Sequence, residues 1–358
     1  MSFDRALFER ALRETRDGEL GEPLTHLALT GSTNDDAAEA AKAGAPHGAV
    51  FIADQQTQGR GRQGKRWDGA PGEDLLCSVL LRPRLAPSVV SQLTLAVGLA
   101  LRDAVERWIH SPDAAHGAHP VGAGFKPTGV SPADPPGDPG NPVGARFKPA
   151  LTGVSSADPP GDPGTHPLTR TGIDALRWNP VGAGFKPALT RTPPVVQIKW
   201  PNDVWIEGRK VAGVLVESQL RGAELASAVV GVGLNLRRAP LPPELSGATS
   251  VAHFTSAPPS RELALAGFLV ELERRVSQLT LAGLTSILPE LRRHDGLLGR
   301  RIQVEGRVAI GRGIATDGAL LIEREDGALT RVRSGSVEVL DEVAHSATDV
   351  RLTAKPPK

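Results

Sequence analysis

A long segment rich in proline and glycine, from His110 to Pro194, limits which parts of this chain can pack into a core. It holds 17 of the 31 prolines in the 358-residue chain and few large apolar side chains. Proline lacks a backbone N–H donor and disrupts helices and strands, and glycine raises the entropic cost of ordering the backbone. We therefore predict that residues 110–194 form a disordered insertion on the surface of a folded protein.

Repeated sequences within this insertion suggest how it arose. One unit occurs three times and a second unit twice: PVGAGFKPTGV from Pro120, PVGARFKPALTGV from Pro142, PVGAGFKPALTRT from Pro180, SPADPPGDPG from Ser131 and SSADPPGDPG from Ser155. Their spacing is irregular, whereas stacked solenoid repeats need a fixed period. We hypothesise that a repeated DNA element was inserted in frame, so that the protein tolerates removal of residues 111–193. The alternative is a proline-rich recognition arm.

The composition of the whole chain is that of an ordinary globular protein, with 40% hydrophobic and 23% charged residues. A formal net charge of +1 gives no sign of a nucleic-acid or membrane partner. The single cysteine, Cys77, excludes an internal disulfide and fits a reducing compartment. The N-terminus mixes acids and bases without the apolar core of a signal peptide, and no stretch approaches the ~20 apolar residues of a membrane span. We predict a cytoplasmic protein.

Outside the insertion, the patterning predicts one α/β unit followed by an all-β tail. Helices are expected over 33–44, opened by a capping box from Thr33 to Asp36, over 92–108, and after Ser260 as an N-cap. Strands are expected over 49–54, 75–83, 195–200, 211–218 and 227–236. From Gly299 the pattern predicts short strands separated by the turn dipeptides Asp317-Gly318 and Asp326-Gly327. This arrangement is typical of a small β-barrel. The predicted domains are 1–295, interrupted by 110–194, then a barrel over 296–342 and a disordered tail over 343–358.

The sequence QQTQGRGRQGKRWDG, from Gln55 to Gly69, is the richest local signal for a binding site. Its closely spaced glycines let the backbone approach a ligand and present N–H groups, and its cationic side chains are Arg60, Arg62, Lys65 and Arg66. Together they predict a site for a phosphate chain or a carboxylate.

Two well-known phosphate-binding patterns match this loop formally. The spacing Gly59-x-Gly61-x-x-Gly64 fits the dinucleotide fingerprint, but no helix is expected at the third glycine and no acid stands at the expected distance. The spacing from Gly59 to Lys65 also approaches a P-loop, but Arg66 stands where a hydroxyl should hold magnesium. We therefore reject both interpretations.

Three further short motifs carry polar side chains at the ends of predicted elements. In KWPND, Lys199 ends an apolar strand, and a buried lysine without a partner is costly unless an anion binds there. Asn202 and Asp203 follow Pro201 and are suited to bracing the turn or binding a ligand. GVGLN ends a strand with Asn235 at its tip. The last motif, Ser32-Thr33-Asn34, is compatible with simple helix capping.

Taken together and in this order, the motifs resemble the catalytic domain of biotin–protein ligases. The shared sequences are GSTND at Gly31, Q-T-x-GRGRxG-x-x-W from Gln56, KWPND at Lys199, GRKxAGxLVE at Gly208 and GVGLN at Gly231. The resemblance covers essentially the whole chain outside the insertion. It implies an α/β (α+β) fold with a mixed sheet flanked by helices, like class II aminoacyl-tRNA synthetases and lipoate ligases.

The resemblance also implies roles for particular residues. The biotin pocket would be lined by Ser32, Thr33, Asn34, Gln56, Arg60, Gly61, Arg62 and Lys199. Arg62 and Lys199 would act in catalysis, and ATP or the adenylate would contact Arg62, Trp67, Asn202, Lys210 and Asn235. No residue is assigned with certainty as a metal ligand. Cys77 lies in an apolar strand and is expected to be a buried core thiol.

The implied reaction uses ATP and Mg²⁺ to convert biotin into biotinyl-5'-AMP and then attaches biotin to a lysine of a biotin carboxyl carrier protein. Cations and magnesium suffice for attack of a carboxylate on ATP, without a protein nucleophile. Only about thirty residues precede Gly31, too few for the helix-turn-helix domain of family members that repress transcription, so a ligase that does not repress is expected. An edge strand of the sheet can pair two subunits, which makes a homodimer one expected arrangement.

Other functions stay open at this point. A lipoate–protein ligase or octanoyltransferase shares the fold and the style of reaction, but the chain lacks an RRxxGGG-like stretch. A non-catalytic nucleotide- or biotin-binding regulator is an alternative if the insertion abolishes turnover. A nucleic-acid-binding protein is a third reading, which salt-independent, weak binding to DNA would argue against.

Overall fold

The computed structural model describes residues 2–15, 18–67, 69–83, 85–86, 89–110, 193–222, 224–237, 241 and 243–340. All of these residues belong to one compact unit. The predictions for the insertion between 110 and 194, beyond its border residues, and for the tail over 343–358 fall outside the described residues. The predicted domain boundaries stay predictions.

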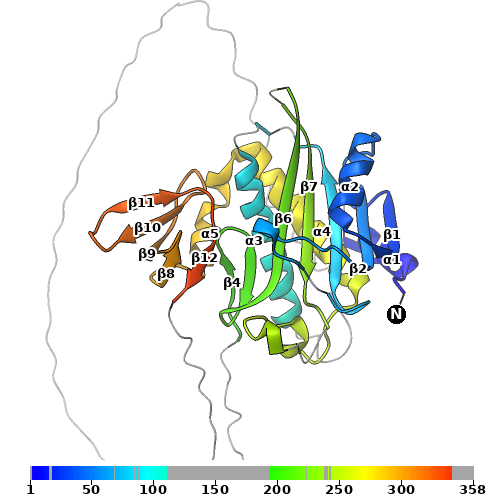
Figure 1. Cartoon of the computed structure of the whole chain (residues 1–358). Coiled ribbons are helices and arrows are strands. Elements are labelled where there is room, and N and C mark those ends of the chain that lie inside the picture. The colour runs from blue at the N-terminus through cyan, green and yellow to red at the C-terminus, as the bar shows by residue number, and fades with distance from the viewer. Residues whose placement is uncertain are drawn as a thin grey trace, which may run out of the picture. The chain divides into compact units, whose positions relative to one another are not determined.

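A seven-stranded mixed sheet forms the centre of the fold, with the strand order β1-β2-β3-β7-β6-β5-β4 (Figure 1). Its β1–β2 pair is parallel and its other neighbours are antiparallel. The strands are β1 (Leu24–Thr30), β2 (Val50–Gln56), β3 (Leu75–Leu81), β4 (Val196–Lys199), β5 (Asp203–Ile206), β6 (Arg209–Arg221) and β7 (Glu224–Leu234).

Helices cover both faces of this sheet. The helices are α1 (Arg5–Thr15), α2 (Thr33–Lys42), α3 (Val90–His110), α4 (Arg261–Ala282) and α5 (Leu288–Arg293). Helix α2 contacts β2, β3 and β7, and its apolar residues form a small core with Phe51 and Val229. Helices α3 and α4 pack together and cover the main core. Strand β3 is buried along its whole length, as expected for a continuous apolar strand covered on both faces.

The predicted elements are found with small shifts at their ends, and one predicted cap is wrong. Ser260 is the N-cap of α4, and its side chain accepts from the Leu263 N–H. The capping box predicted from Thr33 to Asp36 is absent, because the helix begins one residue earlier with Ser32 as N-cap and no side-chain cap bond. Asp36 instead accepts a hydrogen bond from the Thr30 hydroxyl at 2.7 Å.

The C-terminal strands form a second sheet of five antiparallel strands. They are β8 (Arg301–Val304), β9 (Arg307–Ile314), β10 (Leu320–Arg324), β11 (Leu329–Val332) and β12 (Val337–Val339), in the order β11-β10-β9-β8-β12. Both predicted Asp-Gly turns connect neighbouring antiparallel strands, β9 with β10 and β10 with β11. A closed barrel is not seen in the described residues, because β11 and β12 lie at opposite ends of the sheet.

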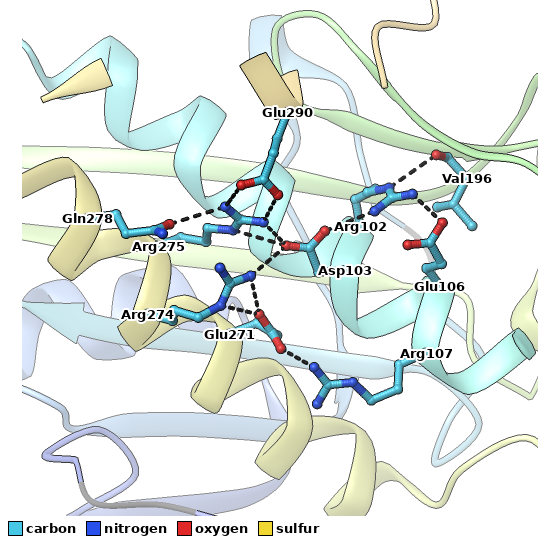
Figure 2. A network of polar contacts seen from close by, with 10 residues as sticks. All are labelled: Arg102, Asp103, Glu106, Arg107, Val196, Glu271, Arg274, Arg275, Gln278 and Glu290. Atoms are coloured by element: carbon cyan, nitrogen blue, oxygen red, sulfur yellow. Dashed lines mark hydrogen bonds and ion pairs between the residues drawn. The ribbon is translucent and has the colours of Figure 1, made fainter. Parts of the chain in front are cut away.

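A network of arginines and carboxylates joins α3, α4 and α5 (Figure 2). Arg275 of α4 lies at its centre and pairs with Asp103 of α3 at 2.5 Å and with Glu290 of α5. Arg274 contacts Asp103 and Glu271, at 3.0 and 2.7 Å. Each arginine meets a carboxylate, so the buried charges of these helices are compensated.

None of the helices in the described part of the chain is long and apolar enough to cross a membrane.

The two described ends that border the insertion lie next to each other. The His110 ring nitrogen Nε2 is 3.1 Å from the Pro194 carbonyl oxygen. A short linker can therefore close the gap when residues 111–193 are removed. We expect the unfolding temperature of this deletion variant to lie within about 3 °C of that of the full chain, because the free energy of closing a loop changes little with its length. Calorimetry of both chains checks this, and a deletion variant that does not fold would contradict it.

Asp295, which follows α5, is a buried carboxyl whose charge is poorly compensated. Its Oδ1 accepts from the Leu297 N–H at 2.9 Å, whereas its buried Oδ2 has no hydrogen-bond partner in the described structure. Burial raises the pKa of Asp295 from 3.8 to about 6. The folded protein therefore holds this proton more tightly than the unfolded chain does between these two pH values. The free energy of unfolding therefore falls as the pH rises from 3.8 to about 6, and the total loss above pH 6 is about 3 kcal/mol.

We expect Asp295→Asn to become more stable than the parent protein as the pH rises from 4 to above 6. The asparagine keeps the acceptor for Leu297 but carries no charge, although its buried N–H groups reduce the gain to about 1–2 kcal/mol. Urea unfolding of both proteins at several pH values measures the difference. Asp317→Asn is the matched control, because the pKa of Asp317 is lowered by the Ala319 N–H and its difference should have the opposite sign. A pH-independent difference for Asp295→Asn would contradict the assignment.

Candidate active site

A polar cleft lies where the start of α2, the loop after β2 and the turn between β4 and β5 come together. It also receives residues from β6, β7 and the segment that leads into β12. Every site residue predicted from the sequence lines this cleft except Asn235: Ser32, Thr33, Asn34, Gln56, Arg60, Gly61, Arg62, Trp67, Lys199, Asn202 and Lys210. Segments far apart in the sequence thus supply one site.

One side of the cleft is a hydrogen-bonded set of uncharged side chains. The Gln56 Oε1 atom accepts from the Thr33 backbone N–H at 2.8 Å and from its hydroxyl at 3.1 Å. Ser78, buried on β3, lies 2.8 Å from the Thr33 hydroxyl and 2.6 Å from the Asn34 Oδ1 atom. Because Gln56 uses its oxygen on Thr33, its amide nitrogen remains as the donor. Sequence reasoning missed Ser78, which sits inside an apolar strand.

A second set, which carries charge, continues from Asn34. The Asn34 Nδ2 atom donates to Glu217 of β6 at 2.7 Å. Glu217 also pairs with Arg60 at 3.1 Å, and Arg60 pairs with Asp35 at 2.7 Å. Asn34 therefore uses both ends of its amide within the protein. Sequence reasoning assigned no role to Glu217 or Asp35, although both lie within the quoted motifs.

The basic loop from Gly59 to Trp67 is a short hairpin. The Trp67 N–H donates to the Gly59 carbonyl at 2.9 Å, and the Gly61 N–H donates to the Lys65 carbonyl at 2.6 Å. Its tip is a single 3-10 turn over Arg62–Gly64, so no helix begins there and the rejection of the dinucleotide and P-loop patterns is confirmed. Glycine is required at position 59, where an added Cβ would lie 2.4 Å from the Trp67 carbonyl oxygen.

Glycines of β6 and β7 make room for side chains of the cleft. An added Cβ at Gly233 would lie 2.3 Å from the Trp67 ring, and one at Gly231 would lie 2.1 Å from the Asn34 Oδ1 atom. Gly213 pairs with Gly233 across the strands, and an added Cβ at Gly213 would lie 3.1 Å from the Trp67 ring. The GVGLN motif thus acts through its glycines, which leave the face of the sheet open to the cleft.

Several cations surround the Asp203 carboxylate at the other side of the cleft. Asp203 lies 2.8 Å from Lys210 and 3.9 Å from Lys199, and its charge also acts on Arg62. Burial lowers the pKa of Lys199, Asp203 opposes that effect, and Lys210 and Lys65 add to it. Burial likewise lowers the pKa of Arg62. The excess of positive charge makes this region a site for an anion with several charges.

Two predicted adenylate contacts serve the protein itself. Asn235 is buried and does not line the cleft, since its Nδ2 atom donates to the Thr249 carbonyl at 2.9 Å. Asn202 lines the cleft, but its Nδ2 atom donates to the Val214 carbonyl at 2.7 Å and braces the turn. The structure therefore does not bring Asn235 together with the other predicted residues.

A thiol and possible metal ligands are the other groups that bear on the chemistry of this site. Cys77 is fully buried, as predicted, and burial raises the pKa of its thiol to about 12. No group of three or more histidines, cysteines and acids able to hold a metal ion occurs among the described residues. The cations around Asp203 suit this cleft to stabilisation of negative charge.

Comparison with known proteins shows which family the chain resembles. A model of the "Biotin/lipoate A/B protein ligase family" matches residues 27–125 and 178–235. The Mycobacterium tuberculosis protein "Biotin--[acetyl-CoA-carboxylase] ligase" is 28% identical over 330 residues, which are 88% of this chain and 90% of the relative. The Bacillus subtilis protein "Bifunctional ligase/repressor BirA" is 23% identical over 329 residues, which are 89% of this chain and 75% of the relative.

Solved structures support the same fold. The biotin protein ligase from Aquifex aeolicus in complex with biotin and ATP matches with a TM-score of 0.58 and 20% identity, covering 89% of this chain and all of that one. The chain is thus similar to proteins of the biotin/lipoate A/B protein ligase family. The resemblance predicted from the motifs, the mixed α/β fold and the assignment to a ligase class of enzyme are thereby confirmed.

Proposed function

We propose that this protein is an ATP-dependent biotin–protein ligase. It forms biotinyl-5'-AMP from biotin and ATP, then transfers biotin to a lysine of a biotin carboxyl carrier protein, in a biotin-dependent carboxylase such as acetyl-CoA carboxylase. The observation that carries the proposal is the pairing of an uncharged polar end, at Gln56 and Thr33, with a cationic end around Asp203 in one cleft. The polar ring of biotin suits the uncharged end of the cleft. The carboxylate of biotin and the phosphates of ATP suit the cationic end.

The first step joins the biotin carboxylate to the α-phosphate of ATP and releases pyrophosphate. Negative charge grows on the phosphate as the new bond between carboxylate oxygen and phosphorus forms. Lys199 and Arg62 are half-buried cations beside that position, where a low dielectric strengthens their effect. In the second step the lysine amine of the acceptor attacks the acyl carbon of the mixed anhydride, an amide forms and AMP leaves.

The residues divide between the two ligands. Ser32, Thr33 and Gln56 would bind the ring of biotin, with Asn34 holding the start of α2 in place. Arg60 and Gly61 would close over the carboxylate, and Trp67, Lys210 and Asn202 would lie by the adenylate. Asn235, which the sequence analysis assigned to this group, is not carried into the proposal because it lies outside the cleft.

Magnesium would enter with ATP. Among the described residues that line the cleft, Asp203 is the carboxylate beside the cations, and it is already paired with Lys210. Magnesium keeps several waters and binds through few carboxylates together with substrate phosphates, so the nucleotide would supply most of its ligands. We assign no protein ligand to the ion.

The acceptor, the compartment and the assembly complete the proposal. The acceptor would be a biotin carboxyl carrier domain whose lysine reaches the cleft. A single buried cysteine fits a reducing cytoplasm. Neither nucleic acid nor membrane enters the reaction. A homodimer formed by pairing of edge strands stays a prediction.

The experiment that tests the function is transfer of biotin to a purified carrier domain, read by streptavidin blot, with ATP omitted as the control. We expect ATP-dependent labelling that disappears in Arg62→Ala. Parallel reactions with lipoic and octanoic acid on a lipoyl domain test the rival activities of the family. Labelling by these acids instead of biotin would replace the proposal. Binding of biotin without release of pyrophosphate would identify a non-catalytic regulator.

A further inference from the structure

Glu217 joins the uncharged side of the cleft to the basic loop. Its Oε2 atom accepts from the Asn34 amide at 2.7 Å and from Arg60 at 3.1 Å, and its Oε1 atom lies 3.3 Å from the same Arg60 nitrogen. Arg60 in turn meets Asp35, the residue after Asn34 in α2, at 2.7 Å. The contacts thus form a closed ring between α2, β6 and the loop.

The carboxylate sets the direction of the hydrogen bonds along this ring. Ionised Glu217 can only accept, so the Asn34 amide must point its NH₂ group toward β6 and its carbonyl toward Ser78. The Ser78 hydroxyl then donates to Asn34, and the Thr33 hydroxyl can donate to Gln56. Among the described residues no acceptor is seen for the Gln56 amide nitrogen, so its two donors can bind a ligand.

The loop needs an anchor because its own charges repel each other. Arg60, Arg62, Lys65 and Arg66 lie within seven residues of sequence. Like charges at such spacing disfavour a compact hairpin. The two carboxylates Asp35 and Glu217 engage one terminal nitrogen of Arg60, and so attach the loop to α2 and β6.

We propose that Glu217 is a positioning residue of the ligase: it holds Arg60 and Asn34 so that the basic loop is already folded against the cleft when the carboxylated substrate arrives. The expected effect on biotin kinetics rests on the proposed function, whereas the anchoring of the loop by Glu217 does not. Without the anchor, binding of biotin must also order the loop, and that cost falls on binding rather than on the chemical step.

The test compares Glu217→Gln with the parent protein. The glutamine retains an acceptor for Asn34 but presents an NH₂ group or a neutral oxygen to Arg60, so the loop contact is lost selectively. Trypsin cuts after arginine and lysine, which makes the four cations of the loop a direct reporter of its opening. We expect cleavage in the loop to be about fivefold faster or more in Glu217→Gln, with a melting temperature within about 2 °C, because Glu217 is a half-exposed group.

Kinetics separate positioning from a catalytic contact. We expect the KM for biotin to rise about tenfold with kcat within about twofold, and Asp35→Asn to behave in the same direction because it removes the other anchor. Glu224→Gln, an exposed acid on the same β6–β7 hairpin, is the matched control and should resemble the parent.

The outcomes distinguish this inference from the proposed function. Unchanged cleavage of the loop in Glu217→Gln would overturn the role of Glu217, whatever the enzyme does with biotin. A fall in kcat without a change in KM would also overturn it. If the parent protein transfers no biotin, the proposed function is refuted. The proteolysis result would still decide whether Glu217 anchors the loop.

Discussion

Replacement of Lys199 by alanine is expected to lower the rate of biotinyl-adenylate formation by about 100-fold or more. Lys199 ends β4, and its side chain is 17% exposed and 3.9 Å from Asp203. A cation held at low exposure acts on charge that develops in the reaction far more strongly than one in water, and loss of one such contact typically costs a factor of about 100 to 1,000. Exchange of labelled pyrophosphate into ATP, dependent on biotin, measures this step without the acceptor protein.

The design of this experiment separates catalysis from folding. Burial lowers the pKa of Lys199, so removal of its ammonium group relieves a desolvation cost and should not lower the melting temperature by more than about 2 °C. Lys42→Ala, at the exposed end of α2, is the matched control and should retain the parent rate. An exchange rate for Lys199→Ala within threefold of the parent would show that the cation cluster does not act on the reacting phosphate.

The parts of the fold that could be predicted from the sequence are those in which one chemical pattern dominates. The continuous apolar run of β3 and the helical spacing of α3 report burial directly. Helix α1 was not predicted, although its apolar residues Leu7, Phe8, Ala11 and Leu12 recur at helical spacing and three of them, Phe8, Ala11 and Leu12, are buried. Strand β5 is four residues long and follows a turn, which leaves too little sequence for a period.

The failed capping box shows how a distant contact overrides a local preference. Thr33 and Asp36 have the residue types for a reciprocal cap. The Gln56 side chain, from the end of β2, instead takes the Thr33 N–H and hydroxyl. The helix start is therefore fixed by a residue 23 positions away, which no window of local sequence contains.

The candidate site was predictable to the extent that its residues lie in loops with unusual composition. The basic loop and KWPND stand out because glycine, proline and charge occur together. Ser78 could not be found in the same way, because its role depends on the pairing of β3 with β7, which places it opposite Gly231. Asn235 was predicted to contact the adenylate because a polar strand end looks available, whereas its Nδ2 atom donates to the Thr249 carbonyl at 2.9 Å.

Loss of the Arg275 guanidinium should destabilise the protein more than loss of the arginine next to it. The Arg275 side chain is 2% exposed and pairs with Asp103 and Glu290 (Figure 2), whereas the Arg274 side chain is 39% exposed. Removal of the buried Arg275 leaves Glu290 without this partner and weakens the compensation of Asp103, which costs about 3 kcal/mol. Removal of the half-exposed Arg274 leaves Asp103 paired with Arg275 and Glu271 paired with Arg107, so it costs about 1 kcal/mol or less. We therefore expect Arg275→Met to lower the free energy of unfolding by about 3 kcal/mol and Arg274→Met by less than about 1 kcal/mol.

The dependence of this difference on pH identifies its cause. The hydrogen bond from Arg275 lowers the pKa of Glu290 below its usual 4.5, although burial opposes it. The contact therefore stabilises the fold above that pH and is lost as the pH falls through the lowered pKa of Glu290. Urea unfolding at pH 7 and below pH 4 should show that the cost of Arg275→Met shrinks in acid, while the cost of Arg274→Met changes little. Equal costs for the two variants at pH 7 would mean that α3, α4 and α5 are held together by their apolar packing and not by this network.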